Sequence, residues 1–128
     1  MRILGPILIL LALFTLAGCE RETDCEKAVR KNLAALCQSH EEKMARLKAD
    51  NTCEKTLQSN LLMCEDRCNS DPGCWTDCSR AAVDESLSCR QDRSDRISST
   101  ERDIKEHCEG EPGYEYSRSA MVLKCESR

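Results

Sequence analysis

Apolar residues recur every three or four positions from residue 24 onward, which is the spacing of one face of an α-helix. In residues 24–49 this pattern predicts a first helix whose apolar face carries Cys25, Val29, Leu33, Leu36, Cys37, Met44 and Leu47. Thr23 precedes this helix and Glu26 follows three residues later, which predicts a capping box at its start. No run of alternating apolar and polar residues indicates a strand. The pattern therefore predicts an all-α domain.

Two further helices are predicted on either side of a short turn. Residues 52–69 and a helix from about residue 73 each place apolar residues on one face: Cys53, Leu57, Leu61, Cys64 and Cys68 in the former, and Cys74, Cys78, Ala82 and Cys89 in the latter. Residues 69–73 between them have the sequence NSDPG, which is typical of a turn. We therefore expect an antiparallel helical hairpin with flanking helices.

The flanking segments are less regular. Asp50, Asn51 and Thr52 interrupt the first helical pattern, and Asn51 followed by Glu54 predicts a new cap there. Beyond Cys89 the polar residues 90–106 keep apolar residues at helical spacing, either as an extension of the same helix or as a fourth helix that ends at Gly110. A turn is expected at 111–113 and a last short helix at about 118–126.

The six central Cys residues have a palindromic spacing, Cys53-x10-Cys64-x3-Cys68-x5-Cys74-x3-Cys78-x10-Cys89, centred on residue 71. Residues equidistant from the turn of an antiparallel hairpin lie at the same height. Offsets of 4 and 11 residues return to nearly the same helix face, because they are close to one and three turns of about 3.6 residues. The spacing therefore predicts three disulfides across the hairpin: Cys68–Cys74, Cys64–Cys78 and Cys53–Cys89.

The outer Cys residues are less constrained. A nested continuation gives Cys37–Cys108 and Cys25–Cys125, and an exchange of partners among these four is the alternative. With Cys19 set aside the chain has ten Cys, an even number that suits a disulfide framework in an oxidising compartment. Residues 19–128 contain only 17 large apolar side chains, a poor core for which disulfides are the usual compensation.

The twin Cys-x3-Cys segments, 64–68 and 74–78, resemble the disulfide-bonded helical hairpins of small chaperones of the mitochondrial intermembrane space. The resemblance covers residues 64–78 only, and the turn here is shorter than in that family. It implies that disulfides pair across the hairpin as they do in that family, and it does not imply a chaperone function.

Residues 1–18 have the composition of an export signal. Arg2 and the start amine give a positive end, and residues 3–16 are almost wholly apolar, too short a stretch for a comfortable membrane span. The segment ends in Leu16-Ala17-Gly18-Cys19, which resembles the lipobox of bacterial lipoproteins.

The lipobox resemblance implies cleavage after Gly18, transfer of a diacylglyceryl group to the sulfur of Cys19, and acylation of the new amine. Residues 19–23 then form a tether, and residues 24–128 form the Cys-rich helical domain. Two or three acyl chains anchor a protein stably. Glu20, where inner-membrane members of the family carry Asp, implies an outer-membrane location that faces the periplasm.

The chain has 128 residues, of which 33% are charged and 3% aromatic, and a net charge of −4. Loss of residues 1–18 leaves 110 residues, enough for one small domain, with a net side-chain charge of −5 because Arg2 is lost with them. This balance argues against nucleic-acid binding, which normally needs a basic patch. The expected partners are the lipid bilayer, through acylated Cys19, and an unidentified envelope protein.

No catalytic motif is present. The sequence lacks Cys-x-x-Cys, Gly-x-Ser-x-Gly, His-Glu-x-x-His and a glycine-rich phosphate loop, so we expect no enzyme activity and no cofactor. Reduced Cys64, Cys68, Cys74 and Cys78 could instead hold zinc or copper, and Cys-rich helical bundles resemble bacterial copper-storage proteins. Disulfides explain the mirror spacing without a metal, and His40 and His107 lie far apart in the sequence, so no metal site is the preferred interpretation.

The few aromatic residues are candidates for partner contact. Trp75 follows the turn, where it either covers the disulfide cluster or contacts a partner. Tyr114 and Tyr116 follow the turn at 111–113, where they either pack on the first helix or lie exposed for recognition. Residues 111–116 would then be the active loop of an inhibitor or immunity-type lipoprotein that blocks a periplasmic enzyme. The preferred interpretation is a lipoprotein with a non-enzymatic structural or partner-binding role.

Overall fold

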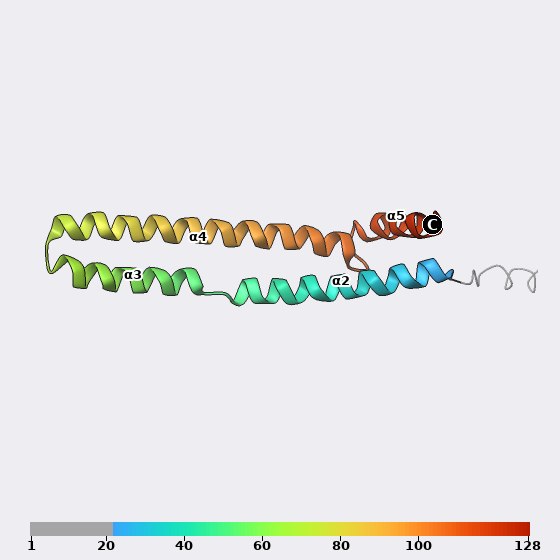
Figure 1. Cartoon of the computed structure of the whole chain (residues 1–128), viewed down its shortest axis with the longest axis horizontal. Helices are drawn as coiled ribbons and strands as arrows, with labels where there is room; N and C mark the ends of the chain where they lie inside the picture. The colour runs from blue at the N-terminus through green and yellow to red at the C-terminus, as the bar shows by residue number, and fades with distance from the viewer. Residues whose placement is uncertain (1–21) are drawn as a thin grey trace, which may run out of the picture.

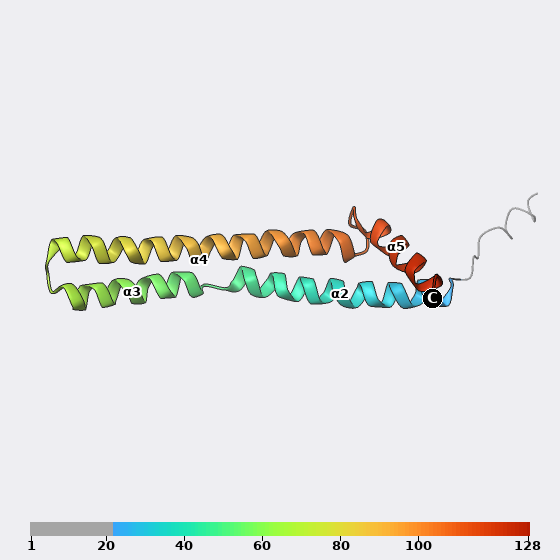
Figure 2. The same ribbon diagram turned by 45° about the horizontal axis from the view of Figure 1, so that its top comes forward.

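The computed structural model describes residues 22–128, in which all regular structure is α-helical (Figure 1). The helices are α2 (Asp24–Ala49), α3 (Thr52–Cys68), α4 (Pro72–His107) and α5 (Tyr114–Glu126). α2 and α3 follow one another along the length of α4, and α5 packs at the end where α2 begins (Figures 1 and 2). The expected all-α hairpin with flanking helices is confirmed. The predicted signal segment 1–18 and Cys19 lie outside the described residues.

Five disulfides join the helices of the hairpin at matching heights. They link Cys68 to Cys74, Cys64 to Cys78, Cys53 to Cys89, Cys37 to Cys108 and Cys25 to Cys125. The paired Cα atoms lie 4.9–5.8 Å apart, within the usual range for a disulfide. These are the nested pairs that continue the mirror spacing from the turn to the chain ends, without an exchange of partners among the outer four.

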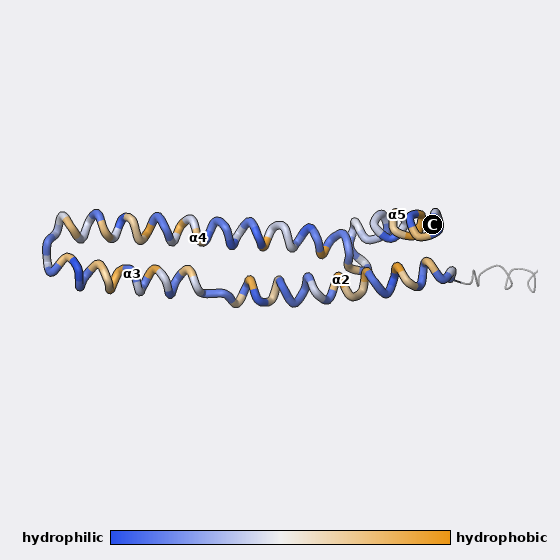
Figure 3. Tube along the Cα trace, viewed as in Figure 1, coloured by the Kyte–Doolittle hydropathy of each residue, from blue (hydrophilic) through white to orange (hydrophobic). Residues whose placement is uncertain are grey.

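A small apolar cluster lies at the α5 end of the molecule, and Met44 and Leu47 of α2 are buried outside it. Val29 and Leu33 of α2 pack with Tyr114, and Met121 and Val122 of α5 lie against them. Between α3 and α4 the buried residues are chiefly Cys53, Cys64, Cys68, Ala82 and Ser86. Figure 3 shows hydrophilic and hydrophobic positions interspersed along both arms of the hairpin. The disulfides therefore occupy much of the space that apolar side chains fill in other helical pairs.

Local signals explain where most helices begin. Thr23 and Glu26 form the predicted capping box at the start of α2. Asn51 is the N-cap residue of α3, as predicted, but its backbone is not in the extended conformation and its side chain makes no capping bond. The Asp50 carboxylate takes this role by accepting hydrogen bonds from the backbone N–H and the hydroxyl of Thr52. Arg93 of α4 donates to the Asp50 carbonyl and so spans the break.

Three other details decide between the alternatives or differ from the expectations. α4 is one continuous helix of 36 residues, which was one of the two alternatives for residues 90–106, and it begins at Pro72 with Asp71 as its cap. α5 begins at Tyr114, four residues before the predicted start at 118. Leu36, predicted on the inward face of the first helix, is 39% exposed. Within residues 22–128 no helix is long and apolar enough to cross a membrane.

Complete reduction should abolish most of the helical structure. A native disulfide contributes about 2–4 kcal/mol to the free energy of unfolding, and the small core offers little to replace five of them. The measurement is far-ultraviolet circular dichroism of protein reduced and alkylated at all ten domain Cys, compared with untreated protein. Retention of the full helical signal in the alkylated protein would contradict this expectation.

Candidate functional site at the hairpin tip

The turn between α3 and α4 is held rigidly at the end of the hairpin remote from α5 (Figure 1). Asn69 and Ser70 adopt left-handed backbone angles, φ 42° and 70°, which reverse the chain within a few residues. The Asp71 carboxylate accepts hydrogen bonds from the N–H groups of Gly73 and Cys74 at 2.9 and 3.3 Å and caps α4. The disulfide from Cys74 then ties the first turn of α4 to the last residue of α3. The tip is therefore preorganised rather than a free loop.

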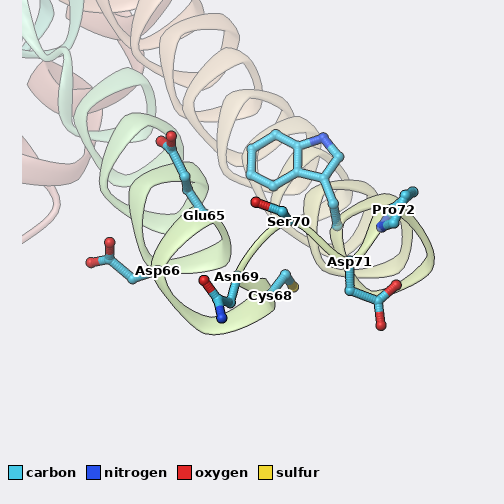
Figure 4. Close-up of a pocket in the computed structure, with 8 residues that line it drawn as sticks. Glu65, Asp66, Cys68, Asn69, Ser70, Asp71 and Pro72 are labelled. Carbon is cyan, nitrogen blue, oxygen red and sulfur yellow. The ribbon is translucent and has the colours of Figure 1, made fainter.

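Trp75 contributes an exposed apolar surface to this tip. It is 39% exposed, so a large part of its surface is open to solvent. It lines an open cavity of about 740 Å³ with Glu65, Asp66, Cys68, Asn69, Ser70, Asp71 and Pro72. Figure 4 shows Glu65 and Asp66 on the α3 side of the cavity and Asp71 and Pro72 on the α4 side. The predicted partner-contact residue thus lies at a surface that a partner can reach.

The tip cavity is acidic. Glu65, Asp66 and Asp71 line it, and in residues 22–128 none of these three carboxylates forms an ion pair. An indole face beside carboxylates attracts a Lys or Arg side chain, through the ring quadrupole and through charge. The arrangement is suited to binding a polar, cationic surface of another molecule.

The two Tyr residues have different environments. Tyr114 is 5% exposed and packs on Val29 and Leu33, so of the two alternatives for this residue the structure shows packing on the first helix and not exposure for recognition. The reason is that α5 begins at Tyr114 and folds back on α2, where the Cys25–Cys125 disulfide holds it. Tyr116 is 82% exposed, but it lies at the opposite end of the hairpin from Trp75 (Figure 1). The three aromatic residues therefore do not form one site.

The structure brings together two His residues that the sequence analysis left apart. The rings of His40 and His107 are stacked with centroids 5.2 Å apart, and His40 Nδ1 lies 3.8 Å from an Asp103 carboxylate oxygen. His40 Nε2 and His107 Nδ1 are buried, and no atom of the described residues hydrogen-bonds to them. The predicted Cys37–Cys108 disulfide could have indicated that the two His residues lie close together, because each of them is within three positions of one of its Cys residues.

The thiolate metal-binding alternative loses its ligands in this structure. All ten Cys of residues 22–128 are in disulfides, which have no thiolate to offer a metal. The sulfurs of Cys37 and Cys108 lie within 4.8 Å of a Glu41 carboxylate oxygen, but they are bonded to each other. The four inner Cys that suggested a zinc or copper site form two disulfides instead.

Comparison with known proteins adds no relative. No family model matches the chain, and neither a curated protein nor a solved structure is significantly similar to it.

Substitution of the two Tyr residues should separate packing from exposure. Tyr114→Ala should lower the free energy of unfolding by about 3–5 kcal/mol, the usual cost of removing a large buried ring. Tyr116→Ala, the matched control two residues away, should change it by less than about 0.5 kcal/mol. Chemical denaturation followed by circular dichroism measures both values. Equal effects of the two substitutions would contradict the assigned packing of α5.

Proposed function

We propose that this protein is a lipid-anchored protein of the bacterial outer membrane that faces the periplasm and has a non-enzymatic, partner-binding role. The sequence Leu16-Ala17-Gly18-Cys19, a short distance before a disulfide-rich domain, carries the proposal. Disulfides form and persist in oxidising compartments such as the periplasm. The ten Cys of the described residues pair among themselves, which leaves none of them as a partner for Cys19. An acyl thioether at Cys19 is consistent with that count.

The geometry suits an anchored rod with a binding tip. The tether from Cys19 to Thr23 is five residues long and spans at most about 17 Å. It leads into the end of the hairpin where α5 packs, whereas Trp75 lies at the other end (Figure 2). α2 and α3, with 26 and 17 residues, follow one another from the tether to the tip and together are about 65 Å long at 1.5 Å per residue. An upright domain would therefore present the acidic tip about 65 Å from the membrane surface.

The surface chemistry favours binding over catalysis. The tip displays a partly exposed indole and carboxylates, the groups that recognise a cationic surface. The buried Tyr114 removes one of the two aromatic contacts on which an inhibitory loop at 111–116 would depend. A partner with exposed Lys or Arg side chains, held in the same envelope, is the occupant that the tip fits best.

Lipid attachment is tested by metabolic labelling with a radioactive or clickable palmitate analogue in a bacterial host. The wild-type chain should be labelled and should sediment with membranes, because Cys19 is the acceptor sulfur. Cys19→Ser should lose the label and leave the membrane fraction, and Cys25→Ser/Cys125→Ser should keep both properties as the matched control. An unlabelled wild-type chain would refute the anchor.

Partner binding at the tip is tested by chemical crosslinking in intact cells followed by mass spectrometry. Trp75→Ala should remove a crosslinked species that the wild type forms, because the indole is the central apolar contact of the tip. Leu87→Ala is the control, since this side chain is 57% exposed on the same helix but does not line the tip cavity. The same crosslinked species in all three proteins would exclude Trp75 as a contact.

A further inference from the structure

A second open cavity lies where the chain passes from α2 to α3, opposite the middle of α4 (Figure 1). It has a volume of about 540 Å³ and is lined by Lys43, Arg46, Leu47, Ala49, Asp50 and Arg96. The lining thus combines three cations, one carboxylate and two apolar residues. Leu47 is the one buried residue of the lining, whereas Lys43, Arg46 and Arg96 are exposed and can be reached by a ligand from solvent.

The three cations of this cavity have no anionic partner in the part of the chain that the structure describes. No carboxylate lies within 4.0 Å of Lys43, Arg46 or Arg96. Arg46 uses its Nε–H to bond the carbonyl of Glu42, which leaves the two terminal nitrogens of its guanidinium group without a protein acceptor. The other Arg residues near the break differ, because Arg90 and Arg93 both pair with Glu54.

The single carboxylate of the cavity does not balance these charges. Asp50 is held by the hydroxyl and the N–H of Thr52, which lower its pKa, with Arg93 and Arg96 adding to the effect. It is therefore ionised at neutral pH and cancels one of the three cations. Arg46 lies in the last turn of α2, where a cation is favoured by the free carbonyl groups of the helix end. This interaction does not explain the positions of Lys43 and Arg96.

We propose that Lys43, Arg46 and Arg96 form a binding site for a phosphate-bearing anion. The lining has a net charge of +2 in a domain that is acidic overall, which favours a negatively charged ligand. Arg guanidinium groups bind phosphate oxygens in a planar, two-point geometry, and Lys adds a mobile charge. The cavity lies at the helix break, because Ala49 and Asp50 at the end of α2 are part of its lining.

Two sources of phosphate have this chemistry, a soluble diphosphate and a phospholipid headgroup. Arg46 lies 22 residues after the first residue of α2, about 33 Å along the helix axis. A headgroup of the anchoring membrane would therefore reach the cavity only when the rod lies flat on the bilayer. An NMR titration with a compound of each kind can distinguish the two sources.

The test is an NMR titration of the purified full-length protein in nonionic detergent micelles. Spectra that record the arginine Nε–H signals are followed during addition of sodium pyrophosphate at constant ionic strength. The signals of Arg46 and Arg96 should shift and saturate, while that of Arg102, an exposed residue of α4 outside the cavity, should not. Arg96→Gln and Lys43→Gln should each weaken binding by about fivefold or more, the effect of about 1 kcal/mol, and Arg102→Gln should leave it unchanged.

A parallel series replaces pyrophosphate with phosphatidylglycerol mixed into the micelles, with phosphatidylcholine as the lipid control. Saturable shifts of Arg46 and Arg96 with pyrophosphate alone support a soluble ligand, and the same shifts with phosphatidylglycerol alone support a headgroup. Proportional shifts of all arginine signals would mean a diffuse ion atmosphere and would overturn the site. The absence of shifts with both additives would overturn it as well. Circular dichroism of each variant checks that the fold is retained.

Discussion

Cross-linking of two antiparallel helical arms at equal heights is the constraint on which this structure depends. A disulfide requires Cα atoms about 4.4–6.8 Å apart, so each one fixes both the distance between the arms and their register. Between α3 and α4 the residues next to the disulfides are as small as Ala82 and Ser86, which contribute little apolar area. The covalent links therefore allow a chain with 33% charged residues and a thin core to hold a long helical pair together.

Several polar features of the molecule lie between the two disulfides that are farthest apart along α4. The longest interval without a disulfide runs from Cys89 to Cys108 on α4, opposite the segment from Cys37 to Cys53. Within this interval lie the stacked His pair, the break at Asp50 and the cavity that Arg96 lines. Arg93 binds the Asp50 carbonyl and the Glu54 carboxylate there, a polar contact in place of a covalent one. The section between the Cys37–Cys108 and Cys53–Cys89 disulfides can therefore accommodate charged groups and water.

Two regularities made most of the fold predictable from the sequence. Helical periodicity gave the bounds of α2 correctly, and the mirror spacing predicted which Cys residues lie opposite one another. The remaining details depend on tertiary contacts. Asp50 and Asn51 are chemically similar neighbours, and the one that caps α3 is decided by a backbone conformation that Arg93 helps to hold. Tyr114 and Tyr116 lie about 200° apart around one helix, so only one of the two rings can face α2. Predicting which ring is buried required knowing the residue at which α5 begins.

The candidate sites were less predictable than the fold. Trp75 could be assigned to the tip because the turn residues fixed its place, but its exposure depends on how far the indole extends over the disulfide. The His pair and the cation-lined cavity combine residues from α2 and α4 that are more than 45 positions apart. No local motif marks such a combination. The His pair and the cavity could both have been predicted by aligning the two arms residue by residue beyond the Cys53–Cys89 disulfide, toward the chain ends.

The placement of the Cys residues along each helix also has a consequence for how the chain is oxidised. Cys64 and Cys68 are four residues apart, and such neighbours on a formed helix hold their Cβ atoms about 5–6 Å apart, beyond the roughly 3.8 Å of a disulfide. Cys25 and Cys37 are about 18 Å apart along α2. Once the helices exist, each sulfur can therefore reach only the one opposite. Each correct disulfide therefore fixes the register of two helical turns, and this register excludes pairing with the next Cys along either helix.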